Sequence, residues 1–248
     1  LTKRAKEKHH QLEKEVLQKA DATLVVGKTM QQNYQQFSDA IYVVTNGFDT
    51  DEKSESKPVL DAKFSITHIG LMNADRNPKV LWKILSELST ENPDFANDLE
   101  IKLIGSIADD VTNELDFYQF KNVVKIPNVP HAEVQNYQKS TQVLLLAINK
   151  VPSAKGIITG KIFEYLQAKR PILAIGPENG DLAEILNSTN AGTIVDFDDA
   201  VKMKQIVIDL YQQYKINKLE VNSKNIEKYH RKEVTKQVSV ILKQVVNS

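Results

Sequence analysis

Lys161 and Glu164 are the residues whose type and spacing best suit them to bind a charged ligand. They stand three positions apart near the start of TGKIFEYLQAKRPILAIGPENGD (residues 159–181). A helix capped by Thr159 or Gly160 presents both on one face. A lysine there can bind a phosphate, and a carboxylate can accept two hydrogen bonds from the vicinal hydroxyls of a ribose. The alternative is an exposed ion pair worth roughly a few tenths of a kcal/mol, but the apolar residues around the pair argue against simple exposure.

A second polar junction lies in ITHIGLMNADRNPKVLWKIL (residues 66–85), where an apolar run ends at Gly70. Asn-Pro at positions 77 and 78 predicts a helix start, with Asn77 as the N-cap and proline at the first helical position. Arg76 then precedes the cap, and Lys79 lies in the first turn, where the helix dipole disfavours cations. An anion such as a diphosphate between the two side chains removes that conflict. The alternative is that both point into solvent.

A third junction is GPENGDLAEIL (residues 176–186). Asn179, Gly180 and Asp181 form a tight turn into a helix, and such a turn exposes backbone N–H groups. Asp181 is most simply the N-cap. We treat the backbone of Asn179 and Gly180 as a candidate contact to a sugar or phosphate.

These junctions belong to a regular alternation of apolar runs and helical patterns. The apolar runs are continuous, which is typical of parallel strands that are covered on both faces; they lie at 22–27, 41–47, 64–70, 99–105, 123–127, 143–149, 171–176 and 192–196. Between them lie helical patterns at 77–91, 111–120, 132–140, 160–169, 181–189 and 199–214. The alternation predicts right-handed βαβ units and an α/β fold with a doubly wound parallel sheet. Ligands of such sheets bind at the carboxyl ends of the strands, where all three junctions fall.

The amino-acid composition further restricts the partners and the chemistry that this chain can have. The 248 residues contain 32 Lys+Arg and 32 Asp+Glu, so the balance of charge gives no reason to expect nucleic acid as a partner. The absence of cysteine excludes disulfides and thiolate chemistry and favours a reducing compartment such as the cytoplasm. No apolar run approaches the roughly 20 residues that a membrane-spanning helix needs.

Motifs of several enzyme classes are missing. The five histidines (His9, His10, His68, His131 and His230) have no metal-ligand spacing, so we expect no metal site. The sequence contains no GxSxG elbow, no Walker phosphate loop and no GxGxxG dinucleotide fingerprint.

The polar segment at 45–64 is a candidate domain boundary. We expect residues 1–45 to be the tail of a preceding N-terminal domain, or a flanking helix–strand layer, and residues 46–248 to form the main domain, which ends in a long helical segment at about 220–247. The chain lacks an initiator methionine and opens on an amphipathic pattern, as expected of a fragment of a longer protein. Its basic start, KRAKEKHH, reads as a solvated face; the alternative is peripheral contact with anionic lipid at the inner face of a membrane.

The order of motifs resembles the nucleotide-sugar-binding half of family-four (group one) glycosyltransferases, which have the GT-B architecture. The resemblance covers residues 12 to 245, and is carried by ADATLVVGKTMQQNYQQF, IYVVTNGFD, THIGLMNADRNPK and GKIFEYLQAKRPILAIGPENGD. It implies a Rossmann-like domain, with Asn46 and Gly47 at the connection between two domains.

The resemblance also implies roles for single residues. Glu164 matches the glutamate that binds the nucleotide ribose. Arg76 and Lys161 match the cations that grip the donor diphosphate and act in catalysis, with Lys79 as a third. Gly70 lies in the turn that lets the backbone approach the donor.

Two positions depart from the family pattern. Leu71 follows Gly70 where the family has arginine, so Arg76 is a substitute by position only. Gly156 stands where the family often has a first glutamate that contacts the transferred sugar. Donor-sugar selection must then differ, or catalysis is weakened.

As a whole, the resemblance implies transfer of a sugar from a nucleotide diphosphate sugar to a saccharide or lipid-linked acceptor, as in polysaccharide biosynthesis. It implies retention at the anomeric carbon, with neither a metal nor another cofactor. The acceptor site would lie in a missing N-terminal domain. Two alternatives stay open: a degenerate, non-catalytic domain that scaffolds an assembly, and a nucleotide-sugar epimerase.

Overall fold

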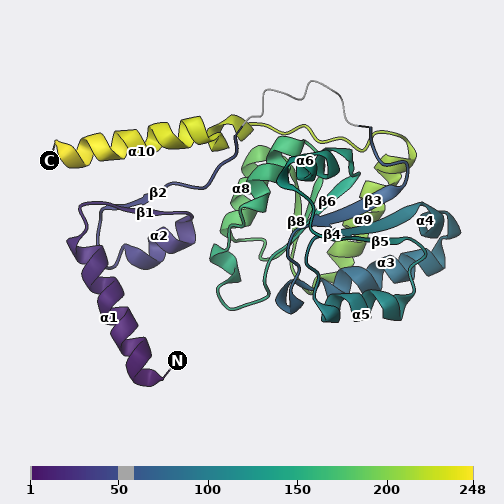
Figure 1. Cartoon of the computed structure of the whole chain (residues 1–248), viewed down its shortest axis with the longest axis horizontal. Coiled ribbons are helices and arrows are strands. Elements are labelled where there is room, and N and C mark those ends of the chain that lie inside the picture. The colour runs from purple at the N-terminus through teal and green to yellow at the C-terminus, as the bar shows by residue number, and fades with distance from the viewer. Residues whose placement is uncertain (1, 50–58, 248) are drawn as a thin grey trace. The chain divides into compact units, whose positions relative to one another are not determined.

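The computed structural model describes residues 2–49 and 59–247, and the chain divides into two compact units (Figure 1). The first, which we call the terminal unit, combines Leu1–Asp49 with Glu227–Ser248. The second, the Rossmann-like unit, is Thr50–Ile226. Each is described separately.

The described part of the Rossmann-like unit holds a parallel sheet of six strands in the order β5-β4-β3-β6-β7-β8. The strands are β3 (Phe64–Ile69), β4 (Leu99–Ile104), β5 (Val123–Ile126), β6 (Val143–Ala147), β7 (Ile172–Ile175) and β8 (Gly192–Val195). Every residue of β3, β6 and β7 is buried, because helices cover both faces of the sheet. The doubly wound parallel sheet predicted from the continuous apolar runs is confirmed.

Helices connect successive strands. They are α3 (Lys79–Glu91), α4 (Pro93–Asp98), α5 (Asp109–Tyr118), α6 (His131–Ser140), α7 (Lys161–Ala168), α8 (Asp181–Thr189) and α9 (Ala200–Lys215), with short 3₁₀ turns η1 (Ala74–Arg76) and η2 (Ala154–Gly156). Helix α3 packs with α5 and α9, and α6 packs with α7. Figure 1 shows α3 and α5 on one side of the sheet and α6 on the other.

The largest core lies between the sheet and the α3 side. Trp82 and Leu85 of α3 are fully buried against Phe64 and Ile101 of the strands. This packing holds the start of α3, and with it the loop after β3, in a fixed place.

A buried arginine at the opposite end of the sheet has structural partners. Arg170, 8% exposed, donates to the carbonyl oxygens of Thr141, Gln142 and Leu219. Its guanidinium therefore ties the start of β6 to the segment after α9.

Two predicted helix starts are each wrong by one residue. Helix α3 begins at Lys79 with Pro78 in the cap position, because the Asn77 side chain accepts a hydrogen bond from the Trp82 indole (2.8 Å) instead of capping the helix. Asp181 is the first residue of α8, and Gly180 occupies the cap position.

The terminal unit contains α1 (Lys3–Lys19), β1 (Thr23–Val25), α2 (Lys28–Tyr34), β2 (Ile41–Val43) and α10 (Arg231–Val246), the last preceded by the 3₁₀ turn η3 (Ile226–Tyr229). Strands β1 and β2 pair in parallel over a small core of Leu17, Val25 and Ile41. Helix α10 confirms the predicted C-terminal helical segment. No helix in the described ranges is both long enough and apolar enough to cross a membrane.

Helix α10 groups with the N-terminal elements. The backbone of Phe48 accepts a hydrogen bond from Arg231 (2.9 Å) and donates one to Tyr229 (3.0 Å). The first stretch of the terminal unit thus ends at Asp49, four residues beyond the boundary expected from sequence, and residues 227–248, which the sequence pattern places in the 46–248 domain, fall in the other unit.

Candidate functional site

The strand order places a topological switch point between β3 and β6. From β3 the chain proceeds to β4 and β5 in one direction, and from β6 to β7 and β8 in the other. The loops that leave β3 and β6 therefore separate at the carboxyl edge of the sheet, and such a crevice is where open α/β sheets bind ligands. The loop after β3 carries Gly70 and Arg76, and the connection after β6 leads into Lys161.

Two cations converge on one backbone oxygen at this point. The Leu71 carbonyl accepts hydrogen bonds from Arg76 Nη1 (3.1 Å) and Lys161 Nζ (3.4 Å). Arg76 is held from its other side, because its Nε donates to Asn149 Oδ1 (2.6 Å) in the loop after β6. Within the described residues, neither cation forms an ion pair with a carboxylate. The switch point therefore has two neighbouring positive charges that share a neutral acceptor.

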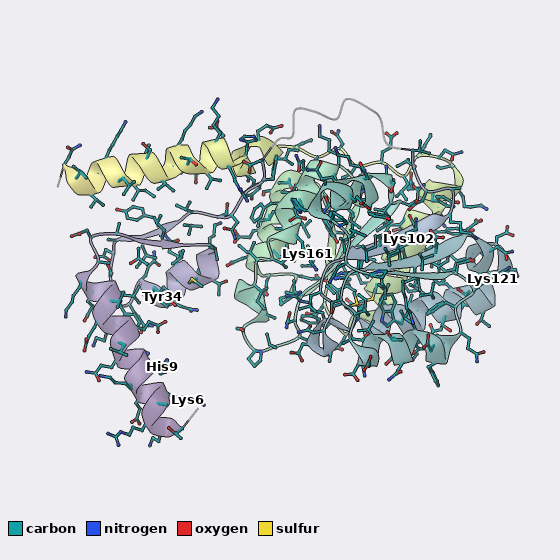
Figure 2. The ribbon with its side chains drawn as sticks, in the orientation of Figure 1. Lys6, His9, Tyr34, Lys102, Lys121 and Lys161 are labelled. Carbon is teal, nitrogen blue, oxygen red and sulfur yellow. The ribbon has the colours of Figure 1, made fainter. Side chains whose placement is uncertain are left out.

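Lys161, labelled in Figure 2, comes from the first turn of α7, where the Thr159 hydroxyl accepts from its backbone N–H (3.1 Å). Burial lowers the pKa of Lys161 from 10.5 to about 8, and the nearby positive charge of Arg76 contributes to this lowering, against the opposing effect of Glu164. The negative charge of Glu164 therefore compensates only in part for the burial of the ammonium and the repulsion by Arg76. An anionic ligand would supply further negative charge.

Gly70 makes room for the Lys161 side chain. A Cβ atom on Gly70 would lie 2.7 Å from Lys161 Cε and 2.9 Å from its Nζ, and Gly70 has a φ of +105° that side-chain-bearing residues rarely adopt. Directly after the neighbouring strand β4, a Cβ on Gly105 would lie 2.8 Å from the Gly70 carbonyl oxygen. Two glycines at the ends of adjacent strands therefore let the turn after β3 pack closely against β4 on one side and the lysine on the other.

His68 in β3 contacts the same ammonium and was missed by the sequence analysis. Its Nε2 lies 3.2 Å from Lys161 Nζ and 3.3 Å from the Leu71 carbonyl oxygen, and its Nδ1 lies 3.3 Å from the Leu145 carbonyl oxygen. Burial, together with the charge of Lys161, lowers the pKa of His68 to about 3, so the imidazole is neutral at physiological pH. The only signal in the sequence was a histidine inside an apolar strand, two residues before Gly70.

Glu164 lies one turn further along α7 and is half-buried. Its Oε2 accepts a hydrogen bond from Nε2 of Gln138, a buried residue of α6 (2.9 Å). Across the described part of the chain, Oε1 has no hydrogen-bond partner. One oxygen is therefore fixed by the protein, and the other is free to accept from a ligand. Sequence reasoning did not find Gln138.

The other predicted site residues lie outside this cluster. Lys79 pairs with Glu114 of α5 (3.7 Å) and is two-thirds exposed. Asn179 is exposed, and the Gly180 N–H donates to Pro177 O (3.2 Å) inside its own turn. Gly156 ends η2, so no carboxylate is supplied from that position.

A surface pocket of about 320 Å³ adjoins Arg76 on the α3 side of the switch point. The loop around η1 and the start of α3 form one wall, and Ile148, Ile175 and Phe197 are among the other lining residues. At its rim, Lys150 pairs with Asp198 (2.6 Å).

Comparison with known proteins rests on structure. No family model matches the sequence, and no curated protein does. The chain is similar to sucrose-phosphate synthase from Thermosynechococcus elongatus, with a TM-score of 0.69 and 12% identity over 99% of this chain and 64% of that one. It is also similar to alpha,alpha-trehalose 6-phosphate synthase from Burkholderia multivorans, with a TM-score of 0.68 and 11% identity over 96% of this chain and 62% of that one.

A third structure is a TarM variant from S. aureus in complex with fondaparinux, alpha-GlcNAc-glycerol and UDP. Its TM-score is 0.66, with 14% identity over 97% of this chain and 47% of that one. The fold is the Rossmann-like α/β fold of GT-B glycosyltransferase halves. The chain spans about half to two thirds of the length of these three proteins.

Proposed function

We propose that the Rossmann-like unit binds the nucleoside diphosphate of a nucleotide sugar, and that the chain is the donor-binding portion of a glycosyltransferase. The observation that carries the proposal is the pair of cations, Arg76 and Lys161, that meet at the Leu71 carbonyl without a carboxylate. A diphosphate carries oxygens and negative charge at a spacing that two such donors can bind together. The switch point between β3 and β6 is the place where this fold binds ligands.

The solved structures support the same assignment. The TarM variant was solved with UDP, and the other two proteins are named as synthases of sugar phosphates. This chain spans only part of their length, and we assign none of its residues to binding of the acceptor. We expect transfer to a saccharide or lipid-linked acceptor, with retention and without a metal, as the family resemblance implies.

The residues have separate tasks in this proposal. Arg76 and Lys161 stabilise the negative charge that grows on the diphosphate as the bond to the sugar breaks, which is the largest contribution a protein can make to such a step. Glu164, held by Gln138, accepts hydrogen bonds from the ribose hydroxyls through its free oxygen. The absence of a side chain at Gly70 keeps Lys161 close to the strand end.

The second candidate function is a non-catalytic scaffold, which the glycine at position 156 favours. A scaffold of this kind has no need to keep an ammonium buried at the cost of a lowered pKa, as Lys161 does. Binding of a nucleotide by the unsubstituted chain would favour the donor-binding function, and an absence of binding would favour the scaffold. An epimerase would require further acid–base carboxylates beside Glu164, and no contact described at the switch point supplies one.

The test is calorimetric titration of the chain with UDP, GDP and inorganic pyrophosphate. We expect micromolar binding of one nucleotide, about −8 kcal/mol. Arg76→Ala should weaken the binding of both the nucleotide and pyrophosphate by about tenfold, since a charge-assisted hydrogen bond contributes roughly 1.5–3 kcal/mol. Glu164→Ala should weaken nucleotide binding alone, because pyrophosphate has no ribose.

Lys83→Ala and Glu87→Ala are matched controls, since this exposed pair lies on α3 and its two side chains meet only at 3.9 Å. Neither control should change any affinity. An absence of binding by every nucleotide and by pyrophosphate would contradict the proposal and favour the scaffold.

Asn149 gives an independent prediction. Its side chain orients the Arg76 guanidinium through a 2.6 Å hydrogen bond and has no charge of its own. Asn149→Ala should weaken pyrophosphate binding about three- to tenfold, because the guanidinium loses one of its two fixed contacts and becomes mobile. In a double-mutant cycle, Asn149→Ala should cause no further loss of pyrophosphate affinity in a chain that already carries Arg76→Ala. Additive losses of affinity would show that Asn149 does not act through Arg76.

A further inference from the structure

We propose that His68 is a positioning residue that holds the Lys161 ammonium over Gly70 and directs it toward the ligand at the switch point. The inference rests on the proposed function, in which that ligand is a diphosphate. His68 lies behind the lysine, in the buried central strand β3, and does not contact the ligand itself.

The hydrogen bonds define which atoms of the imidazole do this. A lysine ammonium has three donors and no acceptor, so His68 Nε2 must be unprotonated to accept from Lys161 Nζ at 3.2 Å. The proton of the neutral ring then lies on Nδ1, which donates to the Leu145 carbonyl oxygen at 3.3 Å. The Leu71 carbonyl oxygen lies 3.3 Å from Nε2, so the two carbonyls by themselves favour opposite tautomers. In our proposal the ammonium decides between them, because it donates to both Nε2 and the Leu71 oxygen and so favours the ring with its proton on Nδ1.

The same contacts fix where the ammonium points. Two of its donors are directed at His68 Nε2 and the Leu71 carbonyl oxygen, and the described residues supply no third acceptor. The remaining N–H is available to a ligand oxygen. Because His68 is fully buried and Gly70 lacks a side chain, the lysine lies directly against the strand end instead of extending into solvent.

The charges around the Lys161 ammonium favour a hydrogen-bond acceptor that carries no positive charge. The groups that act on Lys161 are Arg76 from η1, which repels it, Glu164 from its own helix, which attracts it, and His68 from β3. A protonated His68 would add a second repulsion and would turn its Nε2 into a donor. Burial prevents this, since the pKa of His68 is lowered to about 3.

Two substitutions separate the acceptor from the rest of the ring. His68→Gln keeps an acceptor oxygen close to the position of Nε2, whereas His68→Asn keeps a donor for the Leu145 carbonyl and removes the acceptor. We expect His68→Asn to weaken UDP and pyrophosphate binding about tenfold at pH 7. His68→Gln should stay within about threefold of the unsubstituted chain, because the lysine keeps its hydrogen bond.

A second measurement requires no ligand. The rate at which acetic anhydride labels Lys161, followed by mass spectrometry as a function of pH, reports the titration of its amine. The midpoint should lie at a pH of about 8 for the unsubstituted chain. It should fall by about one pH unit in His68→Asn, since the charged form loses an acceptor, and should stay in place in His68→Gln. A purely structural role for His68 would lower the melting temperature of both variants without moving this midpoint.

The two measurements distinguish two kinds of failure. If the unsubstituted chain binds neither UDP nor pyrophosphate, the proposed function is wrong, and the labelling midpoints still decide whether His68 holds Lys161. If the chain binds UDP but His68→Asn changes neither the affinity nor the midpoint, the inference about His68 is overturned while the proposed function stands.

Discussion

Replacing Lys161 by methionine is expected to weaken UDP and pyrophosphate binding by about 10- to 100-fold and at the same time to stabilise the fold. The loss of affinity follows from the removal of one of the two cations at the Leu71 carbonyl, since a hydrogen bond to a charged group contributes about 1.5–3 kcal/mol. Affinity of the unsubstituted chain should also fall as pH rises past about 8, where the ammonium loses its proton.

The gain in stability follows from the same pKa. Burial lowers the pKa of Lys161 from 10.5 to about 8, so the folded state holds this proton more weakly than the unfolded state. That penalty is fully present below pH 8, amounts to about 3 kcal/mol, and disappears as pH rises to 10.5. Because His68 Nε2 loses its donor in the variant, we expect a net gain of about 1–2 kcal/mol in the free energy of unfolding at pH 7.

Urea unfolding at pH 7 and pH 10.5, combined with calorimetric titration, checks both effects. Lys83→Met is the matched control, because Lys83 is 67% exposed on α3. The control should leave both affinity and stability unchanged. A Lys161→Met variant that loses stability at pH 7 would contradict the penalty for burial of the lysine. A variant that binds pyrophosphate as well as before would contradict the proposed role of the lysine in binding.

Gly70→Ala is expected to have the second largest effect, with about tenfold or greater loss of diphosphate binding and a lower stability. The added methyl group would lie 2.7 Å from Lys161 Cε, so the lysine must move away from His68 and from the ligand. The φ of +105° adds backbone strain, which costs roughly 1–3 kcal/mol.

Two other glycines test whether the loss of binding comes from the lysine or from strain alone. Gly105 has a φ of +119°, and its nearest neighbours are atoms of the Gly70 backbone, so Gly105→Ala should destabilise the chain at least as much. Gly160, before α7, has open space around it and should tolerate alanine. Equal binding by Gly70→Ala and the unsubstituted chain would show that Lys161 does not depend on this close approach.

The fold could be predicted from local patterns, because continuous apolar runs and amphipathic helices are properties of short segments. Helix starts were less certain, as two Asn-Pro pairs show. Asn92 caps α4 through Asp94 and Phe95 N–H groups, with Pro93 in the first turn. Asn77 carries the same signal, but its side chain bonds to Trp82 instead. A buried indole N–H needs an acceptor, and the sequence does not tell which asparagine will supply it.

In the candidate site, some residues could likewise be predicted from the sequence and others could not. Lys161, Glu164, Arg76 and Gly70 stand at ends of elements, where spacing alone marked them. Their partners were not predictable, since His68 is 93 residues from Lys161 and Asn149 is 73 residues from Arg76. Such pairs meet only through strand order, and nothing local to His68 separates a hydrogen-bond acceptor from a core residue.

The Leu71 carbonyl has a consequence for how a ligand would enter. It holds Arg76 and Lys161 together by a neutral oxygen that each can exchange for a charged one. An arriving phosphate therefore does not need to gather scattered side chains, and the ordering of two long side chains is complete before it binds. The same readiness makes the site unselective among small anions, so sulfate or phosphate in a buffer should compete with the nucleotide. Titrations in chloride at low ionic strength should accordingly give a higher affinity than titrations in phosphate.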